Sequence, residues 1–259
     1  GSPLIEECFD YVYDEIKEDV LLGSISGGTD IISCFALSSP ILPVIRGELQ
    51  CRGLGMDVKA YNTDGQSVLE EKGELVCIKA FPSMPIYFWN DPNGSKYKKA
   101  YFQIFSNIWC HGDLISISEH GGLKIYGRSD TTLNPGGVRI GTAEIYRVLS
   151  SLNYIKDSIV IGQRWNSDQR IVLFIQMKKG IVLKDQQRDE IQSTIITQCS
   201  RRHKPDIILQ VSAIPYTING KKVELAVKQI IEKEPIVNLE AIKDPQVLKN
   251  FKDLPELKI

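Results

Sequence analysis

Cysteine is sparse in this chain, with six residues in 259 and no Cys-x-x-Cys pair among them. That scarcity excludes a zinc ribbon or a dense disulfide framework, and it favours free thiols in a reducing compartment over secretion. No apolar run approaches the roughly 18 residues that a membrane-spanning helix needs. The first residues also lack the charged and apolar regions of a signal peptide. We therefore expect a cytosolic protein without a membrane span.

Net charge is also nearly absent, because 31 lysines and arginines are balanced by 32 aspartates and glutamates, which gives a formal charge of -1. Such a balance gives no global field that attracts nucleic acid, so we expect no nucleic-acid partner. The hydrophobic content of 42% is ordinary for a globular core, and the length fits one large domain or two small ones. A further absence concerns nucleotides: no Ser/Thr/Gly-rich loop with a lysine, of the kind that cradles phosphates, occurs in the sequence.

The most informative stretch is residues 127–145, in which arginines lie among glycines. Gly136 and Gly137 permit positive φ angles and close approach of a ligand to the backbone. Arg128 and Arg139 are fork-shaped donors suited to phosphate or ribose oxygens. On composition alone, a tight hairpin with surface arginines explains the stretch equally well, because a single glycine-rich loop is weak support for a binding site.

The order of these residues is more specific than their composition. The stretch resembles the Gly-Arg-x-Asp signature, with its following Gly-x-Arg and Glu-Ile, of adenylate-forming acyl-CoA synthetases. This resemblance implies that Arg128 meets the nucleotide ribose. It also implies that Gly136, Gly137 and Arg139 line the pantetheine and nucleotide side of the site. Asp130 would then be the hinge between a large N-terminal domain and a small C-terminal one.

A second element, Gly27-Gly28-Thr29-Asp30, follows a short apolar run. Read alone, it is a polar turn. It resembles the family's aromatic/Gly-x-Thr-Glu element, which contacts AMP and helps to hold Mg²⁺. Asp30 stands where the family has glutamate and is one methylene shorter. We therefore expect nucleotide contact by Gly27, Gly28 and Thr29, and nucleotide or metal contact by Asp30.

A third element, His111-Gly112-Asp113, resembles the family's Thr-Gly-Asp, whose aspartate accepts both ribose hydroxyls of AMP. The resemblance carries over to Asp113 and not to His111, which stands in place of threonine. Without the resemblance, Asp113 reads as a carboxylate that caps or pairs locally at the start of a strand.

The first three residues, Gly1-Ser2-Pro3, allow two interpretations. They are either a cloning remnant or the family's Gly-x-Pro element, against which the adenine ring docks. The alternatives stay open, and we count Gly1, Ser2 and Pro3 among the expected nucleotide-binding residues.

The last element presents Lys221 after Asn219-Gly220, in a loop that precedes a helix. Read alone, Lys221 is a surface lysine. The loop resembles the family's Pro-x-Thr-x-x-Gly-Lys element, which makes Lys221 the catalytic lysine, whereas Lys222 is expected to point elsewhere. Asn219 replaces the usual serine and Glu224 follows where the family is more basic. These departures resemble the acetoacetyl-CoA synthetase branch of the family.

The resemblance also predicts an α+β architecture in two domains. Residues 1–129 would end a large adenylate-forming domain with a strand-rich, barrel-like subdomain, since the spacing of its short strands suggests a small β-barrel or a curled sheet. Residues 130–259 would form a small, mobile, mixed α/β domain. Sequence patterns predict helices over 5–16 and 184–202, helices that begin at an N-cap Thr142 and near Val223, and a core containing Phe88, Trp89 and Trp109. Strands are predicted at 20–22, 58–61, 73–78, 114–117, 123–126, 157–162, 170–177 and 206–211.

The implied activity has two steps. Acetoacetate attacks the α-phosphate of Mg-ATP, and CoA then displaces AMP from the acyl-adenylate. Because the family's phosphate loop lies upstream, we expect this chain to be a fragment or one piece of a split enzyme, with the N-terminal part as its partner. Two other classes stay open: a ligase for another short-chain acid such as acetate, and a non-catalytic nucleotide-binding fragment.

Overall fold

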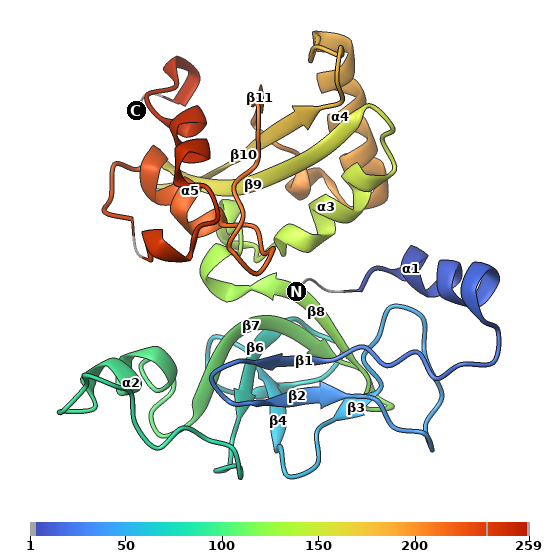
Figure 1. The fold of residues 1–259 in the computed structure, drawn as a ribbon, viewed down its shortest axis with the longest axis vertical. Coiled ribbons are helices and arrows are strands. Elements are labelled where there is room, and N and C mark those ends of the chain that lie inside the picture. Colours follow the sequence, from blue (N-terminus) through green and yellow to red (C-terminus); the bar gives the residue numbers. More distant parts are fainter. Residues whose placement is uncertain (1–3, 237, 258–259) are drawn as a thin grey trace. The chain divides into compact units, whose positions relative to one another are not determined.

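The computed structural model describes residues 4–236 and 238–257, and these form two compact units (Figure 1). The first, here called the strand-rich unit, ends at Ser129, and the second, the α/β unit, begins at Asp130. Gly1, Ser2 and Pro3, which we expected at the adenine ring, lie outside the described residues.

Antiparallel sheets build the strand-rich unit. The larger has the strand order β5-β4-β6-β7-β8 and the smaller the order β1-β2-β3. Both sheets are open over the described residues, so the barrel that the strand spacing suggested is not formed. The strands are β1 (Ser26–Gly28), β2 (Ser33–Leu37), β3 (Cys51–Arg52), β4 (Val58–Tyr61), β5 (Ser67–Val68), β6 (Gly73–Cys77), β7 (Trp109–Ile117) and β8 (Leu123–Arg128).

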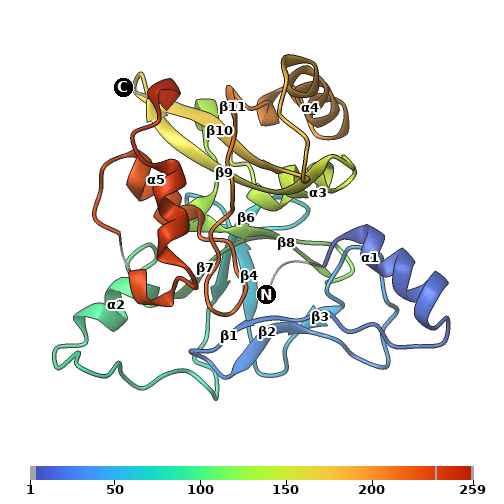
Figure 2. The same ribbon diagram turned by 45° about the horizontal axis from the view of Figure 1, so that its top comes forward.

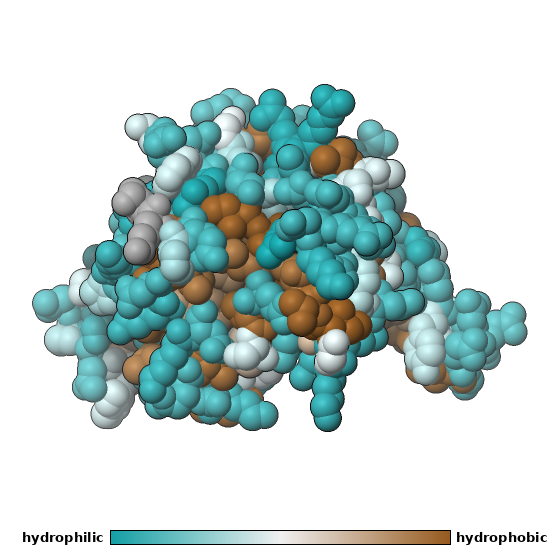
Figure 3. Space-filling model, turned by 90° about the horizontal axis from the view of Figure 1, so that it is seen from above, coloured by the Kyte–Doolittle hydropathy of each residue, from teal (hydrophilic) through white to brown (hydrophobic). Residues whose placement is uncertain are grey.

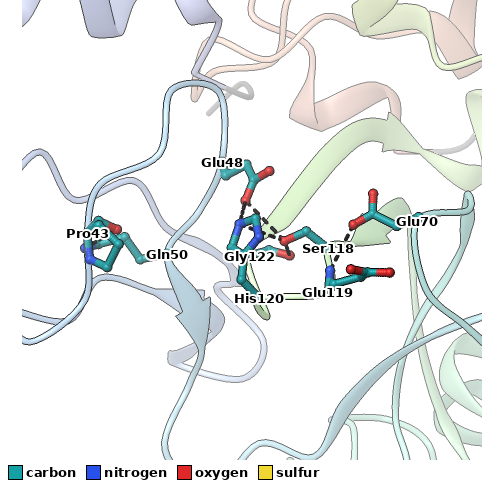
Figure 4. Close-up of polar contacts among 8 residues, drawn as sticks. All are labelled: Pro43, Glu48, Gln50, Glu70, Ser118, Glu119, His120 and Gly122. Carbon is teal, nitrogen blue, oxygen red and sulfur yellow. Dashed lines mark hydrogen bonds and ion pairs between the residues drawn. The ribbon is translucent and has the colours of Figure 1, made fainter.

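The predicted strands at 58–61, 73–78, 114–117 and 123–126 are confirmed, and the last two form the predicted hairpin. Its turn is held by the buried carboxylate of Glu48, which lies 2.8 Å from Nε2 of His120 and accepts a hydrogen bond from Ser118 (Figure 4). The backbones of Leu49 and Leu123 pair beside it. These contacts tie the β7–β8 turn to the loop before β3.

Aromatic rings fill much of the core of this unit. Trp109 is buried and stacks on Tyr101, with ring centroids 3.6 Å apart, and Phe88 packs partly buried against the same cluster. Tyr101 ends helix α2 (Ser95–Tyr101), whose first turn is capped by Asp91 through the backbone N–H groups of Lys96 and Tyr97. The expectation of a core position is therefore correct for Phe88 and Trp109.

Three other expectations for this unit were wrong or only partly right. Trp89 is 84% exposed and lies in a loop, outside the core cluster that contains Trp109. Residues 20–22 form no strand, and Leu21 is 45% exposed. Helix α1 (Glu6–Tyr11) continues as a π-helical turn, Val12–Ile16, and buries only Phe9 of its apolar stripe.

The α/β unit is built on one sheet with the strand order β11-β10-β9. Strands β9 (Ile155–Trp165) and β10 (Asp168–Met177) pair antiparallel, and β11 (Ile207–Gln210) pairs parallel to β10. All three strands were predicted, although β9 and β10 extend beyond the predicted ends. The helices of this unit are α3 (Thr142–Ser150), α4 (Asp185–Gln198) and α5 (Glu224–Ile231).

Helices and helical turns cover both faces of this sheet. Because successive side chains of a strand point to opposite faces, the strands place apolar side chains on both. Val160 and Leu173 pack under α3 and α4, whereas Ile161 and Phe174 pack under α5 and the C-terminal helical turns. Figures 1 and 2 show these helices on the two sides of the sheet. Polar side chains cover much of the face drawn in Figure 3, with apolar groups gathered between them.

Helix ends in the α/β unit differ from the predictions. Gly141, and not Thr142, is the N-cap of α3, since its N–H donates to Glu144 over 2.8 Å and Thr142 is already helical. Helix α4 ends at Gln198, and Arg201–His203 form a separate 3₁₀ turn after Ser200. No helix of the described residues is long and apolar enough to cross a bilayer.

Candidate functional site

Asp113 and Arg128 face each other across the β7–β8 pair. A guanidinium nitrogen of Arg128 lies 3.5 Å from a carboxylate oxygen of Asp113, and it also donates to the backbone carbonyl of His111 over 3.0 Å. The other carboxylate oxygen of Asp113 lies 3.9 Å from Nε2 of His111. Asp113 and His111 are mostly buried, whereas half of the Arg128 side chain is exposed. The carboxylate is thus fixed in position, and the guanidinium reaches solvent.

The Gly27-Gly28-Thr29-Asp30 element lies beside this group. Any side chain at Gly27 would overlap the carbonyl oxygen of Ser33, and one at Gly28 would overlap the Asp30 carboxylate and lie 3.0 Å from the His111 ring. Both glycines are therefore required by close packing. Asp30 and His111 both lie against Gly28, and His111 in turn lies beside Asp113, whereas Thr29 is exposed.

Tyr101 holds Asp30 in place, a contact that no sequence pattern predicts. The Tyr101 hydroxyl donates to a carboxylate oxygen of Asp30, 71 positions away in the chain. Burial, followed by the hydrogen bond to Asp30, raises the pKa of Tyr101 above its usual range. The phenol therefore stays protonated, and it orients the shorter side chain that stands where the family has glutamate.

The fit of Mg²⁺ to this unit can be judged from Asp30. No group of three or more His, Cys, Asp or Glu side chains among residues 4–236 and 238–257 is arranged to hold a metal ion. Mg²⁺, however, is commonly bound through one or two carboxylates together with substrate phosphates and waters. Asp30 is exposed and supplies such a carboxylate. The residues fit a magnesium ion that arrives with a nucleotide.

Gly136 and Gly137 form a 3₁₀ turn, Pro135–Gly137, in the α/β unit. Both have positive φ, 58° and 79°, which glycine adopts at no steric cost. The Gly136 N–H donates to the carboxylate of Asp168, and an added Cβ at Gly136 would lie 3.6 Å from the guanidinium of Arg202. At Gly137, no atom of residues 4–236 and 238–257 lies within 4 Å of such a Cβ. The loop therefore has an open side onto which a ligand can fit.

Arg139 and the hinge candidate Asp130 belong to the same unit. Arg139 lies between this loop and α3, so it is near the glycines in sequence. Asp130 occupies a short 3₁₀ turn, Ser129–Thr131, at the boundary between the units. Within the α/β unit, Asp130 lines a small hollow together with Glu224 and Lys228.

Lys221 projects from a tight hairpin. The Thr217 N–H donates to the Lys221 carbonyl over 2.7 Å, and the Lys221 N–H donates to the Thr217 hydroxyl over 3.0 Å. Gly220 completes the turn with a φ of 78°. The Lys221 side chain is exposed, and its ammonium has no hydrogen-bond or ion-pair partner in the described part of the chain. This ammonium is available to a ligand.

Lys222 points elsewhere, as expected. Its ammonium lies 2.8 Å from Asp157, donates to the carbonyl of Ser158, and lies 4.1 Å above the Tyr146 ring. Truncating Lys222 would leave the carboxylate of Asp157 without this charge partner, so we expect a substitution of Lys222 to disturb the hairpin as well.

Comparison with known proteins agrees with these features. An acetoacetyl-coenzyme A synthetase of Rhizobium meliloti (strain 1021) is 52% identical over 258 residues, covering 100% of this chain and 40% of the relative. An acetoacetyl-CoA synthetase of Gallus gallus is 48% identical over 260 residues, covering 99% of this chain and 39% of the relative.

The solved structure of the acetoacetyl-CoA synthetase from Streptomyces lividans matches 98% of this chain and 39% of its own, with 40% identity and a TM-score of 0.90. The chain belongs to the acetoacetyl-CoA synthetase family. It corresponds to the C-terminal part of these relatives and spans about two fifths of their length. No model in a scan of protein families matched the chain.

Proposed function

We propose that this chain forms the C-terminal part of a ligase that converts acetoacetate, ATP and CoA to acetoacetyl-CoA, AMP and pyrophosphate through an acyl-adenylate. Membership of the acetoacetyl-CoA synthetase family along the whole chain is the observation that carries the proposal. The N-terminal part of the enzyme supplies the phosphate-binding loop and is the partner of this chain. We place the enzyme in the cytosol, and its six thiols, none in a disulfide, agree with that placement.

In this proposal the strand-rich unit binds the nucleotide. Asp113 accepts the ribose hydroxyls, because its carboxylate is an acceptor fixed by Arg128 and His111. The half-exposed guanidinium of Arg128 contacts the nucleotide. Thr29 and the flat surface of Gly27 and Gly28 contact AMP. Asp30 would hold Mg²⁺, and the bound ion would neutralise phosphate charge.

The α/β unit supplies the groups that differ between the two steps. Lys221 places its ammonium between the attacking carboxylate of acetoacetate and the α-phosphate, where negative charge accumulates during adenylation. Rotation about Asp130 then withdraws Lys221 and brings up Gly136 and Gly137, whose open side guides the pantetheine arm of CoA. Arg139 assists the exchange between the two arrangements. The protein's contribution is mainly positioning and charge stabilisation.

The test is isotope exchange between pyrophosphate and ATP, with a protein of the relatives' full length that contains this chain. Exchange should depend on acetoacetate and be much weaker with acetate or butyrate. The present chain alone should show no exchange but should bind AMP weakly in calorimetry, because it has the ribose contacts and not the phosphate loop. Robust exchange by this chain alone, or a preference for acetate, would contradict the proposal.

A further inference from the structure

The hairpin that carries Lys221 is anchored at both of its stems by one carboxylate. Tyr216 begins the hairpin and Lys222 ends it, and their backbones form a bridge with each other. The Tyr216 hydroxyl donates to Oδ2 of Asp157 over 2.5 Å, and the Lys222 ammonium lies 2.8 Å from Oδ1 of the same residue. Each oxygen of Asp157 therefore holds one stem.

Asp157 is itself placed by a rigid element. It lies near the start of β9, pairs in register with Gln176 of β10, and accepts the N–H of Ser158 through Oδ1 over 2.8 Å. The side chain is half-buried, as is that of Lys222. A half-buried ion pair with a second hydrogen bond is less screened by solvent than an exposed one, so it can fix a geometry.

The same contacts decide which of two adjacent lysines faces outward. Lys222 is held inward by Asp157, by the carbonyl of Ser158 and by the Tyr146 ring. Its ammonium thus contacts the Asp157 carboxylate, the Ser158 carbonyl and the Tyr146 ring, and its charge also acts on the nearby carboxyl of Glu224. With Lys222 drawn in, the turn leaves Lys221 on the outside with an ammonium that has no partner among the described residues.

We infer that Asp157 is a positioning residue for catalysis: by clasping Tyr216 and Lys222, it fixes the hairpin from which Lys221 reaches the reacting groups. The inference rests on the proposed function, in which Lys221 acts in adenylation only. Asp157 touches no substrate and acts through Lys221. Its loss should therefore slow adenylation and spare the thioester-forming step.

The experiment compares the two half-reactions in the full-length enzyme. Asp157→Asn keeps the shape of the side chain and removes its charge. We expect adenylation to fall about 10- to 100-fold, the size of effect that a misplacement of about 1 Å produces. Thioester formation from supplied acetoacetyl-adenylate should keep its rate. Tyr216→Phe removes only one hydroxyl and should give a smaller loss of the same kind.

A cycle with Lys222 sharpens the test. Lys222→Met should reproduce the selective loss, and the double variant with Asp157→Asn should be no slower than the worse single variant, since both remove the same clasp. Glu232→Gln is the matched control, because it removes a buried, paired carboxylate from the same unit, where Glu232 binds Arg164. It should leave both half-reactions unchanged.

Hydrogen exchange measured by mass spectrometry on the same proteins reports on the hairpin directly. Peptides with the Thr217, Gly220 and Lys221 amides should exchange faster in Asp157→Asn and Tyr216→Phe, while those from β10 and β11 stay protected. If Lys221→Ala slows adenylation but Asp157→Asn and Tyr216→Phe do not, Asp157 is not a positioning residue and the proposed function stands. If Lys221→Ala itself has no effect on adenylation, the proposed function fails.

Discussion

The two units of this chain present their charged groups in opposite ways. In the strand-rich unit, the carboxylate of Asp113 is already beside Arg128 and His111, and Asp30 already accepts the Tyr101 hydroxyl. In the α/β unit, the Lys221 ammonium has no partner among the described residues, although the hairpin beneath it is firmly held. Groups that bind the same ligand part throughout a reaction can be fixed once. A charge needed in one step only must be carried on an element that can leave.

The largest expected effect comes from removing that one charge. Lys221→Ala in the full-length enzyme should lower the rate of adenylation about 10²- to 10³-fold, as loss of one preorganised charge contact commonly does. Thioester formation from supplied acetoacetyl-adenylate should survive, because in the proposed function Lys221 has left the site before this step. Rapid-quench measurement of each half-reaction checks both parts.

The control for Lys221 is Lys179→Ala, since Lys179 is an exposed lysine of the same unit that lies outside the hairpin and outside the candidate site. It should change neither half-reaction. If Lys221→Ala slows both steps alike, or if Lys179→Ala is equally damaging, Lys221 is not the residue that distinguishes the two steps.

A second prediction concerns the proposed rotation about Asp130. Asp130→Pro fixes φ near -65° and removes an N–H at the boundary between the units. A trapped arrangement should slow one half-reaction about 10²-fold and the other far less, since misplacement by about 1 Å can have that cost. Asp130→Asn keeps backbone freedom and is the control. Equal losses in both half-reactions of a folded Asp130→Pro variant would argue against a hinge at this position.

Much of this fold could be predicted because its strands and helices carry strong local patterns. The buried strands β9 and β10 contain the apolar runs 159–161 and 171–175, and the β7–β8 hairpin has a glycine turn between alternating segments. Weak, short patterns failed. Residues 20–22 are apolar but find no partner strand, and Trp89 lies in a loop outside any helix or strand, where its side chain is exposed.

The candidate site shows the same division. Motif resemblance led to Asp113, Arg128 and Lys221, because their spacing is characteristic of a family. It could not lead to Tyr101 or Asp157, which act through partners 71 and 65 positions away. Such contacts join residues that only the tertiary fold brings together, and no local sequence pattern predicts them. The sequence also could not show that Lys222 is held inward, since both lysines look alike in the chain.

A third prediction concerns Asp113, a fixed group of the strand-rich unit. Asp113→Asn should weaken AMP binding by the full-length enzyme about 10- to 100-fold, in keeping with the loss of a hydrogen bond to a charged acceptor. Calorimetric titration with AMP gives the change in Kd. Glu119→Gln, an exposed carboxylate at the β7–β8 turn, is the control and should bind AMP normally. Unchanged binding in Asp113→Asn would remove Asp113 from the ribose site.

The smallest expected effect concerns Glu224, at the start of α5 beneath the hairpin. Burial raises the pKa of its carboxyl above the ordinary 4.5, and the hydrogen bond from Tyr146 and the charge of Lys222 only partly oppose this. A carboxyl with a raised pKa in the folded state stabilises the fold at low pH. That contribution is lost as the pH rises through the folded-state pKa.

Glu224→Gln cannot ionise and still offers an oxygen to the Tyr146 hydroxyl, which donates to Glu224 over 2.9 Å. The variant should therefore match the parent near pH 4 and exceed its Tm by roughly 1–3 °C at pH 7. Thermal unfolding of this chain across that range, with Glu240→Gln as an exposed control, makes the measurement. A lower Tm for Glu224→Gln at pH 7 would mean that the Glu224 charge supports the base of the hairpin. Its attraction to Lys222 would then outweigh the cost of burial, and the clasp that positions Lys221 would include two carboxylates instead of one.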